Sequence, residues 1–382
     1  MDAFKRFYAG RTVFVTGHTG FKGAWLTSWL LELGAHVTGF SDQVAPGNGL
    51  FKSLGLESRL EHLLGDVRQF DRLNQAIQNC APDVVFHLAA QPLVRYSYEY
   101  PLETFATNVM GTANLLHALR TSRKPVAVVV VTSDKCYENK EWVHSYREED
   151  AVGGFDPYSA SKGCAELVVS SFRRSFFGAP SASAPIAVAT ARAGNVIGGG
   201  DWAADRILPD CIRALMQNLP VRIRKPQGTR PWQHVLEPLS GYLWLGCLLG
   251  RPSQQVVEKN GNGVQPSLSQ LCSAFNFGPG FESTRTVQQL VEEVLKNWPG
   301  AWVDLSSPDD PHEAGLLHLA IDKAVHTLHW HPVWPFETAV GKTVQWYAEI
   351  GQGKRGAAEG VLSDIEAYVQ DARARTLEWA QV

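Results

Sequence analysis

A glycine loop between a short apolar strand and a helix restricts the possible folds most strongly. The sequence Thr-Val-Phe-Val-Thr at 12–16 predicts a strand, and the mostly apolar segment 24–31 predicts a helix. Gly17, Gly20 and Gly23 lie between them. Glycines at such a junction permit a tight turn, close approach of the backbone to a pyrophosphate and close helix–strand packing, while the helix N-terminus supplies N–H donors. We therefore predict dinucleotide binding here, with packing alone as the alternative.

Strand and helix patterns alternate through the first half of the chain. Besides the first pair, they fall at 36–40, 72–77, 84–90, 107–119 and 127–131. This alternation predicts an α/β fold with a doubly wound parallel sheet of Rossmann type. The chain changes character near the glycine run at 198–200, so we assign 1–195 to the dinucleotide-binding domain, with some later segments returning to it. Residues 196–382 then form mainly a smaller, mixed α/β substrate-binding lobe and a C-terminal helix.

Residues that follow the expected strands are candidates for the rest of the cofactor site. Asp42, about 20 residues after the glycines, could hold the adenosine ribose, as could Ser41. A carboxylate near the ribose 2′-hydroxyl favours NAD over NADP because it repels a 2′-phosphate. Asp66 could lie beside the adenine amino group, and the small residues that end the segment 84–90 let a cofactor lie against the backbone.

The candidate catalytic residues lie between 132 and 162. Ser133, Asp134 and Lys135 directly follow an apolar strand, and ligands of open α/β sheets bind beyond the carboxyl ends of the strands. Tyr158 and Lys162 are spaced to share one helix face, where an ammonium group lowers a phenol pKa from about 10. We interpret Tyr158 as a general base for a sugar hydroxyl; a solvated helix surface is the alternative for this spacing.

Together these motifs resemble the extended short-chain dehydrogenases/reductases, the class of nucleotide-sugar epimerases and dehydratases, over nearly the whole chain. Within that family, the segments 15–23, 132–137 and 230–238 resemble the branch of 4,6-dehydratases that acts on CDP-glucose. The resemblance implies NAD as cofactor. The residues that it assigns to NAD are Gly17, Gly20, Phe21, Gly23, Asp42, Asp66, Val67, Leu88, Ala89, Ala90, Asn108, Tyr158 and Lys162.

The implied reaction oxidises C4 of the hexose, eliminates water across C5 and C6, and returns hydride to C6. Tyr158 would take the C4 hydroxyl proton, with Ser133 on the same oxygen and Lys162 steadying the phenolate and the nicotinamide ribose. The resemblance makes Asp134 the acid at C6 and Lys135 the base at C5. In dTDP-glucose relatives that base is a glutamate, so a lysine is a departure and must act in its neutral form. A capped loop with a solvated ion pair is the alternative.

Asn195, Arg206 and Arg230 are the residues that the resemblance would place near the substrate diphosphate. An arginine suits this role because its planar fork binds phosphate oxygens in pairs. A surface ion pair is the alternative for both arginines, and it is strongest for Arg206. No residue distinguishes cytosine from uracil or thymine. The alternative functions are a UDP-N-acetylglucosamine 4,6-dehydratase, a 4-epimerase and a non-enzymatic NAD-binding redox sensor on the same fold.

The composition disfavours several partners. The 382 residues carry a formal net charge of −3, which offers no broad basic surface for nucleic acid. No apolar run approaches the roughly 18 residues that cross a bilayer, so we expect no membrane association. The six cysteines are scattered without a Cys-x-x-Cys pair. This pattern indicates a reduced, cytoplasmic protein.

Three later segments are predicted to be structural. A histidine-rich stretch does not repeat on one helix face, and part of it resembles a structural turn of the family, so we expect no metal. Residues 250–269 predict a surface loop insertion, and 361–379 a final helix that packs on the body or on a partner subunit. Family members commonly pair through the helices around Tyr158, which implies a homodimer or higher oligomer. The histidines of the histidine-rich stretch, for which we expect no metal, are His312, His318, His326, His329 and His331.

Overall fold

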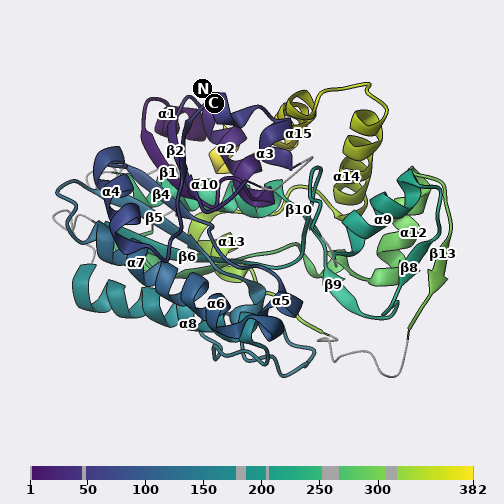
Figure 1. Ribbon diagram of the computed structural model, residues 1–382, viewed down its shortest axis with the longest axis horizontal. Helices are drawn as coiled ribbons and strands as arrows, with labels where there is room; N and C mark the ends of the chain where they lie inside the picture. Colours follow the sequence, from purple (N-terminus) through teal and green to yellow (C-terminus); the bar gives the residue numbers. More distant parts are fainter. Residues whose placement is uncertain are drawn as a thin grey trace.

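A computed structural model describes residues 2–44, 49–177, 186–203, 206–251, 266–306 and 316–381. Its core is a seven-stranded sheet in the order β11-β6-β5-β4-β1-β2-β3, and every pairing in it is parallel. The expected Rossmann-type sheet is confirmed (Figure 1). The strands are β1 (Thr12–Thr16), β2 (His36–Ser41), β3 (Glu61–Leu64), β4 (Val84–His87), β5 (Val126–Val131), β6 (Ile186–Ala193) and β11 (Ala274–Phe277).

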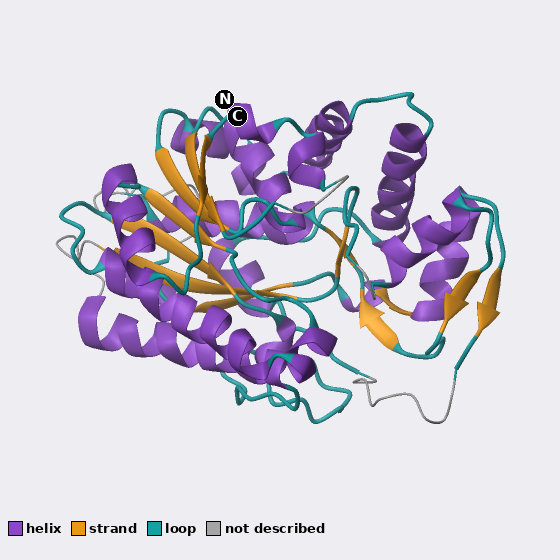
Figure 2. Ribbon diagram, in the orientation of Figure 1, coloured by secondary structure: helices purple, strands orange, loops and turns teal. Residues whose placement is uncertain are grey.

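Helices cover both faces of this sheet, as Figure 2 shows by the purple helices on either side of the orange strands. Alternate residues of β5 therefore belong to two separate hydrophobic clusters: Val126 packs into the cluster on one face, and Ala127 packs into the cluster on the other. One face carries α4 (Phe70–Cys80), α5 (Val94–Glu99), α6 (Pro101–Phe105), the π-helical η2 (Ala106–Met110), α7 (Gly111–Leu119), α8 (Pro157–Phe172) and η4 (Arg173–Phe177). The other carries α1 (Ala3–Tyr8), α2 (Phe21–Glu32), α3 (Leu50–Ser53), η1 (Leu56–Ser58), α10 (Leu236–Leu249), α13 (Asp322–Leu328) and α15 (Ala357–Ala374).

A smaller mixed α/β lobe lies beside the carboxyl ends of the strands, at the right of Figure 1. It contains two parallel strand pairs and one antiparallel pair. Because α10 packs on β5 and β6, and β11 joins the main sheet, the chain passes between the two parts more than once. These elements are β7 (Val196–Ile197), α9 (Ile207–Met216), β8 (Val221–Ile223), β9 (Thr229–Pro231), β10 (Gln233–His234), η6 (Phe281–Ser283), β12 (Thr284–Thr286), α12 (Val287–Asn297), β13 (Trp302–Asp304) and α14 (Phe336–Gly351). The short helix α11 (Leu268–Leu271) precedes β11 and packs on α10 of the main body.

Both ends of the chain differ from the sequence prediction. Residues 3–8 form the helix α1, which local periodicity did not reveal because its side chains are fixed by distant partners: Phe4 stacks on Trp379 at 5.0 Å. The last long helix ends at Ala374, earlier than expected, and Trp379 lies in the short turn η7 (Glu378–Ala380). The helix packs on the body of the protein, where the Tyr368 hydroxyl donates to Glu237 at 2.7 Å.

The predicted loop insertion at 250–269 and the histidine-rich stretch lie partly within the described residues. Residues 252–265 of the expected insertion lie outside the described residues, whereas Leu268 and Ser269 belong to α11 and not to a loop. His312 also lies outside them. The Leu-His-Trp-His-Pro turn is built into the core, since the Trp330 indole donates to Ser240 Oγ at 2.9 Å. None of the described helices has both the length and the apolar character needed to cross a lipid bilayer.

Candidate active site

The glycine loop joins β1 to α2, and its three glycines serve different purposes. Gly17 has a φ of +74°, and a Cβ there would lie 2.7 Å from the Ala89 amide nitrogen. A Cβ at Gly23 would lie 2.1 Å from the Gly17 carbonyl oxygen, so this glycine lets the helix pack on the loop. Gly20 is the N-cap of α2, has no side-chain cap, and would place a Cβ near only the Gly17 oxygen. The helix N-terminus is therefore open to an anion.

The predicted adenosine side lies at the ends of β2 and β3. Asp42 is exposed and follows the last residue of β2, the buried Ser41. Asp66 accepts from the Arg68 backbone N–H at 2.8 Å and from its Nε at 2.7 Å. Burial alone would raise the pKa of Asp66, but these bonds outweigh it and leave the pKa below its usual range. Val67 is buried under Gly111 of α7.

The residues after β4 complete this edge through backbone contacts. Leu88 and Ala89 follow the strand, and the Ala89 N–H donates to Thr16 Oγ1 at 3.2 Å. Asn108 uses its amide inside the protein: Nδ2 donates to the Gln91 carbonyl and to Ser161 Oγ, and Oδ1 accepts from the Gln91 N–H. Its part at this site is to hold the chain after β4 against α8.

Ser133, Asp134 and Lys135 form a tight turn directly after β5. The Ser133 hydroxyl donates to Asp134 Oδ1 at 2.9 Å and accepts from the Lys135 N–H at 3.2 Å. Asp134 is buried, whereas Lys135 is half-buried. Burial raises the pKa of Asp134 above its usual range, against the opposing charge of Lys135 and the bond from Ser133. A carboxyl in this state is suited to donate a proton.

Tyr158 and Lys162 lie in the first turns of α8, which Asp156 caps by accepting from the Ser159 N–H. The expected lowering of the Tyr158 pKa is wrong. Burial raises it to about 12, with the hydrogen bond to Ser133 acting in the opposite direction. Burial lowers the pKa of Lys162 to about 8. Desolvation thus dominates both groups, and the bond to Ser133 ties the phenol to the turn after β5.

The predicted phosphate ligands are Asn195 after β6, Arg206 at the start of α9 and Arg230 in β9. Asn195 Nδ2 is buried and finds no hydrogen-bond partner among the described residues. Arg206 forms an ion pair with Asp201 at 2.8 Å, as its alternative interpretation supposed, yet its charge still acts on the pKa of Tyr158. Arg230 of β9 donates to the Thr229 carbonyl at 2.7 Å, and its charge acts on the pKa of Asp134. The fields of both arginines therefore reach the catalytic side chains.

Comparison with known proteins identifies the family. A family model for GDP-mannose 4,6 dehydratase matches residues 14–343. A CDP-glucose 4,6-dehydratase of Salmonella typhimurium is 46% identical over 346 residues, covering 90% of this chain and 92% of the relative. The chain belongs to the GDP-mannose 4,6 dehydratase family. A probable dTDP-glucose 4,6-dehydratase of Sinorhizobium fredii is 25% identical and covers 89% of this chain and 93% of the relative.

Solved structures of similar proteins share the family's fold. One is a dTDP-glucose 4,6-dehydratase from Streptomyces venezuelae with NAD and TYD bound, with a TM-score of 0.71, 21% identity, and coverage of 88% of this chain and 97% of that one. Another is a UDP-glucose 4-epimerase from Thermotoga maritima with UDP-glucose, also with a TM-score of 0.71, 20% identity, and coverage of 88% and 99%. Because dehydratases and epimerases match equally well, the fold does not separate them.

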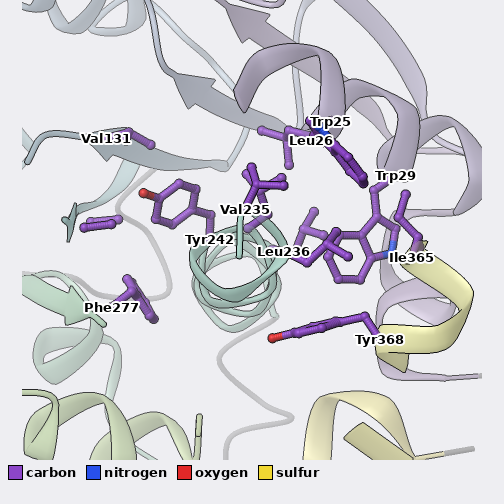
Figure 3. Close-up of a cluster of buried hydrophobic side chains, with 14 of the residues drawn as sticks. Trp25, Leu26, Trp29, Val131, Val235, Leu236, Tyr242, Phe277, Ile365 and Tyr368 are labelled. Atoms are coloured by element: carbon purple, nitrogen blue, oxygen red, sulfur yellow. The ribbon is translucent and has the colours of Figure 1, made fainter. Parts of the chain in front are cut away.

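Sequence reasoning missed Lys22, a half-buried residue in the first turn of α2. Its Nζ lies 3.5 Å from the hydroxyl of Tyr242, which extends from α10 toward Val131 at the end of β5 (Figure 3). Burial lowers the pKa of Lys22 to about 7, assisted by the charge of Arg206 and opposed by that of Asp134. A lysine in the first turn of a helix, where the dipole disfavours cations, was the available signal.

Proposed function

We propose that the protein is an NAD-dependent CDP-glucose 4,6-dehydratase that forms CDP-4-keto-6-deoxyglucose, the starting point for deoxysugars. The turn after β5 carries this proposal, because it places a buried carboxyl of raised pKa between the Ser133 hydroxyl and the amine of Lys135. A 4-epimerase needs no acid and base at C5 and C6. The relative that is 46% identical supports CDP-glucose over other sugar nucleotides.

The described residues fit NAD. Gly20 leaves the N-terminus of α2 open for the pyrophosphate, and the exposed Asp42 lies beyond β2 for the adenosine ribose. Tyr158 and Lys162 would border the nicotinamide ribose. When bound, NAD accepts a hydride from C4 of the sugar and later returns it to C6, so the enzyme consumes none overall.

Oxidation at C4 depends on α8 and the turn after β5. The phenolate form of Tyr158 takes the proton of the C4 hydroxyl as the C4–H bond breaks, and Ser133 donates a hydrogen bond to the same oxygen. Both groups are buried, so their proton transfer is shielded from water. Burial disfavours the phenolate, whereas the bond to Ser133 and the charge of Arg206 favour it. The cationic form of Lys162 stabilises the phenolate, and its pKa of about 8 leaves this form available at neutral pH.

Elimination depends on the next two residues of the turn. The new C4 ketone acidifies the C5–H, whose proton passes to Lys135. Asp134 delivers a proton to the C6 hydroxyl, which leaves as water, and a double bond forms between C5 and C6. The raised pKa of Asp134 supports its role as the acid. After hydride returns to C6, Lys135 gives the proton back to C5. Tyr158 then loses the proton that it gained and Asp134 regains the one that it lost, so the net loss is one water.

The smaller lobe, formed mainly by 196–382, would hold the nucleotide part of the substrate. Asn195 has a buried amide nitrogen without a partner among the described residues, which supports a bond to a ligand oxygen. Arg206 and Arg230 supply positive charge near the same centre. These three residues are the proposed diphosphate ligands.

The decisive experiment offers the protein CDP-glucose, dTDP-glucose, UDP-N-acetylglucosamine and GDP-mannose separately, each with a catalytic amount of NAD. Mass spectrometry then detects the loss of one water, and NMR identifies the 4-keto-6-deoxy product. We expect CDP-glucose to be converted fastest, through many turnovers per NAD. Consumption of one NAD per sugar, or a C4 epimer as the product, would contradict the proposal.

We also propose a homodimer in the cytoplasm. Apolar side chains are exposed along the connected helices α5, α6, η2 and α8, a surface of the kind that a second subunit covers. All six cysteines are free, in keeping with a reducing compartment. Analytical ultracentrifugation tests the oligomeric state, and charged substitutions on this surface should dissociate it. The exposed residues are Tyr98, Leu102, Met110 and Leu167.

A further inference from the structure

A buried ion pair lies directly behind the catalytic turn. Glu166 of α8 and Arg192 of β6 are 6% and 3% exposed, and Arg192 binds the carboxylate with both Nε (3.0 Å) and Nη2 (2.9 Å). Burial alone would raise the pKa of Glu166, but the charge and hydrogen bonds of Arg192 outweigh it, and the pKa lies below its usual range. The pair is therefore ionised.

The pair also binds the residue on each side of the catalytic turn. Thr132, which precedes Ser133, donates its hydroxyl to Glu166 Oε1 at 2.5 Å. Tyr137, which follows Cys136, accepts at its hydroxyl from Arg192 Nη1 at 2.7 Å. The segment 133–136 is thus closed at both flanks by a single ion pair.

Each flank has a second anchor. The Thr132 N–H donates to the Ala191 carbonyl at 3.0 Å, which continues the β5–β6 ladder. The Tyr137 hydroxyl donates to Asn276 Oδ1 at 2.8 Å, and Asn276 belongs to β11 at the edge of the sheet. The flanks of the turn are therefore held by direct bonds to β6 and β11 as well as by the ion pair.

We propose that Glu166 and Arg192 are positioning residues that hold Ser133, Asp134 and Lys135 at the sugar ring. This inference rests on the proposed dehydratase function. A buried ion pair is an inefficient way to gain stability, because desolvation offsets most of its attraction and apolar residues of similar size often stabilise as well. Its advantage is geometric, since the planar guanidinium and the carboxylate fix their partners in direction as well as distance.

The two flanks should serve different half-reactions. Thr132 adjoins Ser133, which acts with Tyr158 in oxidation at C4. Tyr137 lies beyond Lys135 and Cys136, so its bond governs where the elimination residues lie. Loosening one flank should slow one half-reaction more than the other, because a misplacement of about 1 Å can cost on the order of 10²-fold in rate.

The test compares Thr132→Val with Tyr137→Phe. Each substitution removes one hydroxyl and leaves the ion pair intact: Glu166 Oε1 keeps its bond from Arg192 Nε, and Arg192 Nη1 keeps its bond to the Glu148 carbonyl at 3.1 Å. Oxidation is followed in single turnovers by the 340 nm absorbance of the reduced cofactor. Elimination is followed by exchange of the C5 hydrogen with solvent deuterium and by loss of water.

Two substitutions serve as controls. Tyr146→Phe removes a tyrosine hydroxyl that bonds Asn139 and the Lys140 N–H; the Tyr146 ring stacks on Tyr137, and neither bond involves the ion pair. Thr343→Val removes a buried threonine hydroxyl that bonds the Ala339 carbonyl within α14. Thermal unfolding of all four variants measures the cost of losing each hydroxyl.

We expect Thr132→Val to slow oxidation about tenfold, and Tyr137→Phe to slow elimination about tenfold while oxidation stays within about twofold. Both controls should leave the ratio of the two rates unchanged at a similar loss of stability. If all four variants change the two half-reactions in the same proportion, the pair is only structural and the inference is wrong. If the wild-type protein makes no 4-keto product from any sugar nucleotide, the proposed function fails instead.

Discussion

The loop after β1 and the turn after β5 lie at the same edge of the sheet, but they are held in different ways. The glycine loop keeps its shape through backbone contacts, with Gly17 at a φ of +74° against the Ala89 amide. The catalytic turn keeps its shape through side chains, since its flanking residues bond the ion pair of Glu166 and Arg192. The glycine loop thus depends on residues without side chains, whereas the catalytic turn depends on side chains from distant segments of the sequence.

This difference matches what each site must do. A pyrophosphate needs open N–H groups and room for close approach, so the loop has to exclude Cβ atoms. Proton transfers at the C4 hydroxyl, at C5 and at the C6 hydroxyl need side chains held within about 0.5 Å of their working positions, which a network of fixed partners can supply. Substitutions in the turn should therefore affect rates, and substitutions in the loop should affect cofactor affinity and folding.

The largest effect is expected from Lys135→Ala and Tyr158→Phe, which divide the reaction at the turn. Without Lys135, oxidation at C4 continues but proton removal at C5 slows by about 10²–10⁴-fold, the usual cost of losing a general base. Reduced cofactor should then accumulate, which raises the absorbance at 340 nm. Tyr158→Phe should prevent this absorbance from forming, because the C4 hydroxyl keeps its proton.

Two measurements test the assignment further. Exchange of the C5 hydrogen with solvent deuterium should slow in Lys135→Ala by the same factor as product formation. A folded Lys135→Ala variant that binds NAD but forms no reduced cofactor would mean that Lys135 places the substrate or cofactor, and the base would have to lie elsewhere.

A smaller effect is expected in the loop, where Gly17→Ala can be compared with Gly10→Ala. Both glycines have a φ of +74°, but a Cβ at Gly10 meets nothing within 4 Å, whereas one at Gly17 lies 2.7 Å from the Ala89 nitrogen. Gly10→Ala should cost about 1–2 kcal/mol of stability, the usual price of a left-handed alanine. Gly17→Ala should cost more and weaken NAD binding at least tenfold by calorimetry. Equal losses of NAD affinity would refute the close-approach argument.

The same contrast explains which features could be predicted from the sequence. The glycine loop and the strand β1 are visible because their causes are local: missing side chains, and a short apolar run that ends at Thr16. The turn was found from its polar residues, but its support was not. Glu166 bonds a threonine 34 residues away and an arginine 26 residues away, and neither spacing leaves a periodic pattern.

The direction of the pKa shift of Tyr158 was the other property that the sequence could not predict. A lysine one helical turn away suggested a lowered pKa for Tyr158, yet burial raises it. That burial depends on how α8 packs against α5, α6 and α7. For Arg206 the sequence suggested an ion pair as an alternative, but it did not identify Asp201 as the partner. Local spacing places groups on one face, whereas solvent exclusion is a property of the whole fold.

A third prediction compares Glu166 with Glu237, a buried carboxylate of α10 that binds neutral donors instead of an arginine. Burial raises the pKa of Glu237 from its ordinary 4.5 to about 7, whereas the pKa of Glu166 is lowered. The raised pKa of Glu237 means that the folded state binds the proton more tightly than the unfolded chain. Its contribution to stability is therefore complete below 4.5 and is lost as the pH rises through about 7.

Urea unfolding at pH 5 and pH 8 tests this contrast. Glu237→Gln should destabilise the protein less at pH 8 than at pH 5, by on the order of 2 kcal/mol. The cost of Glu166→Gln should stay nearly constant, because the lowered pKa keeps that carboxylate ionised in both states across this range; its contribution is lost only under more acidic conditions. Parallel pH dependence of the two variants would show that the arginine does not set the difference.

The smallest effect concerns the loop side again, at the ribose. Asp42 is exposed, so its repulsion of a 2′-phosphate is weakened by water and salt, and Asp42→Asn should improve NADP binding relative to NAD by only about fivefold. Arg68 is close enough for Asp42 to influence its pKa, and it supplies a positive charge that the substitution leaves unopposed from that side. Asp71→Asn is the matched control, because it removes an exposed carboxylate from the nearby helix α4. Titration of both cofactors at low and high salt should show the change in preference only for Asp42→Asn, and mostly at low salt. An unchanged preference would assign the ribose to Ser41, the buried last residue of β2.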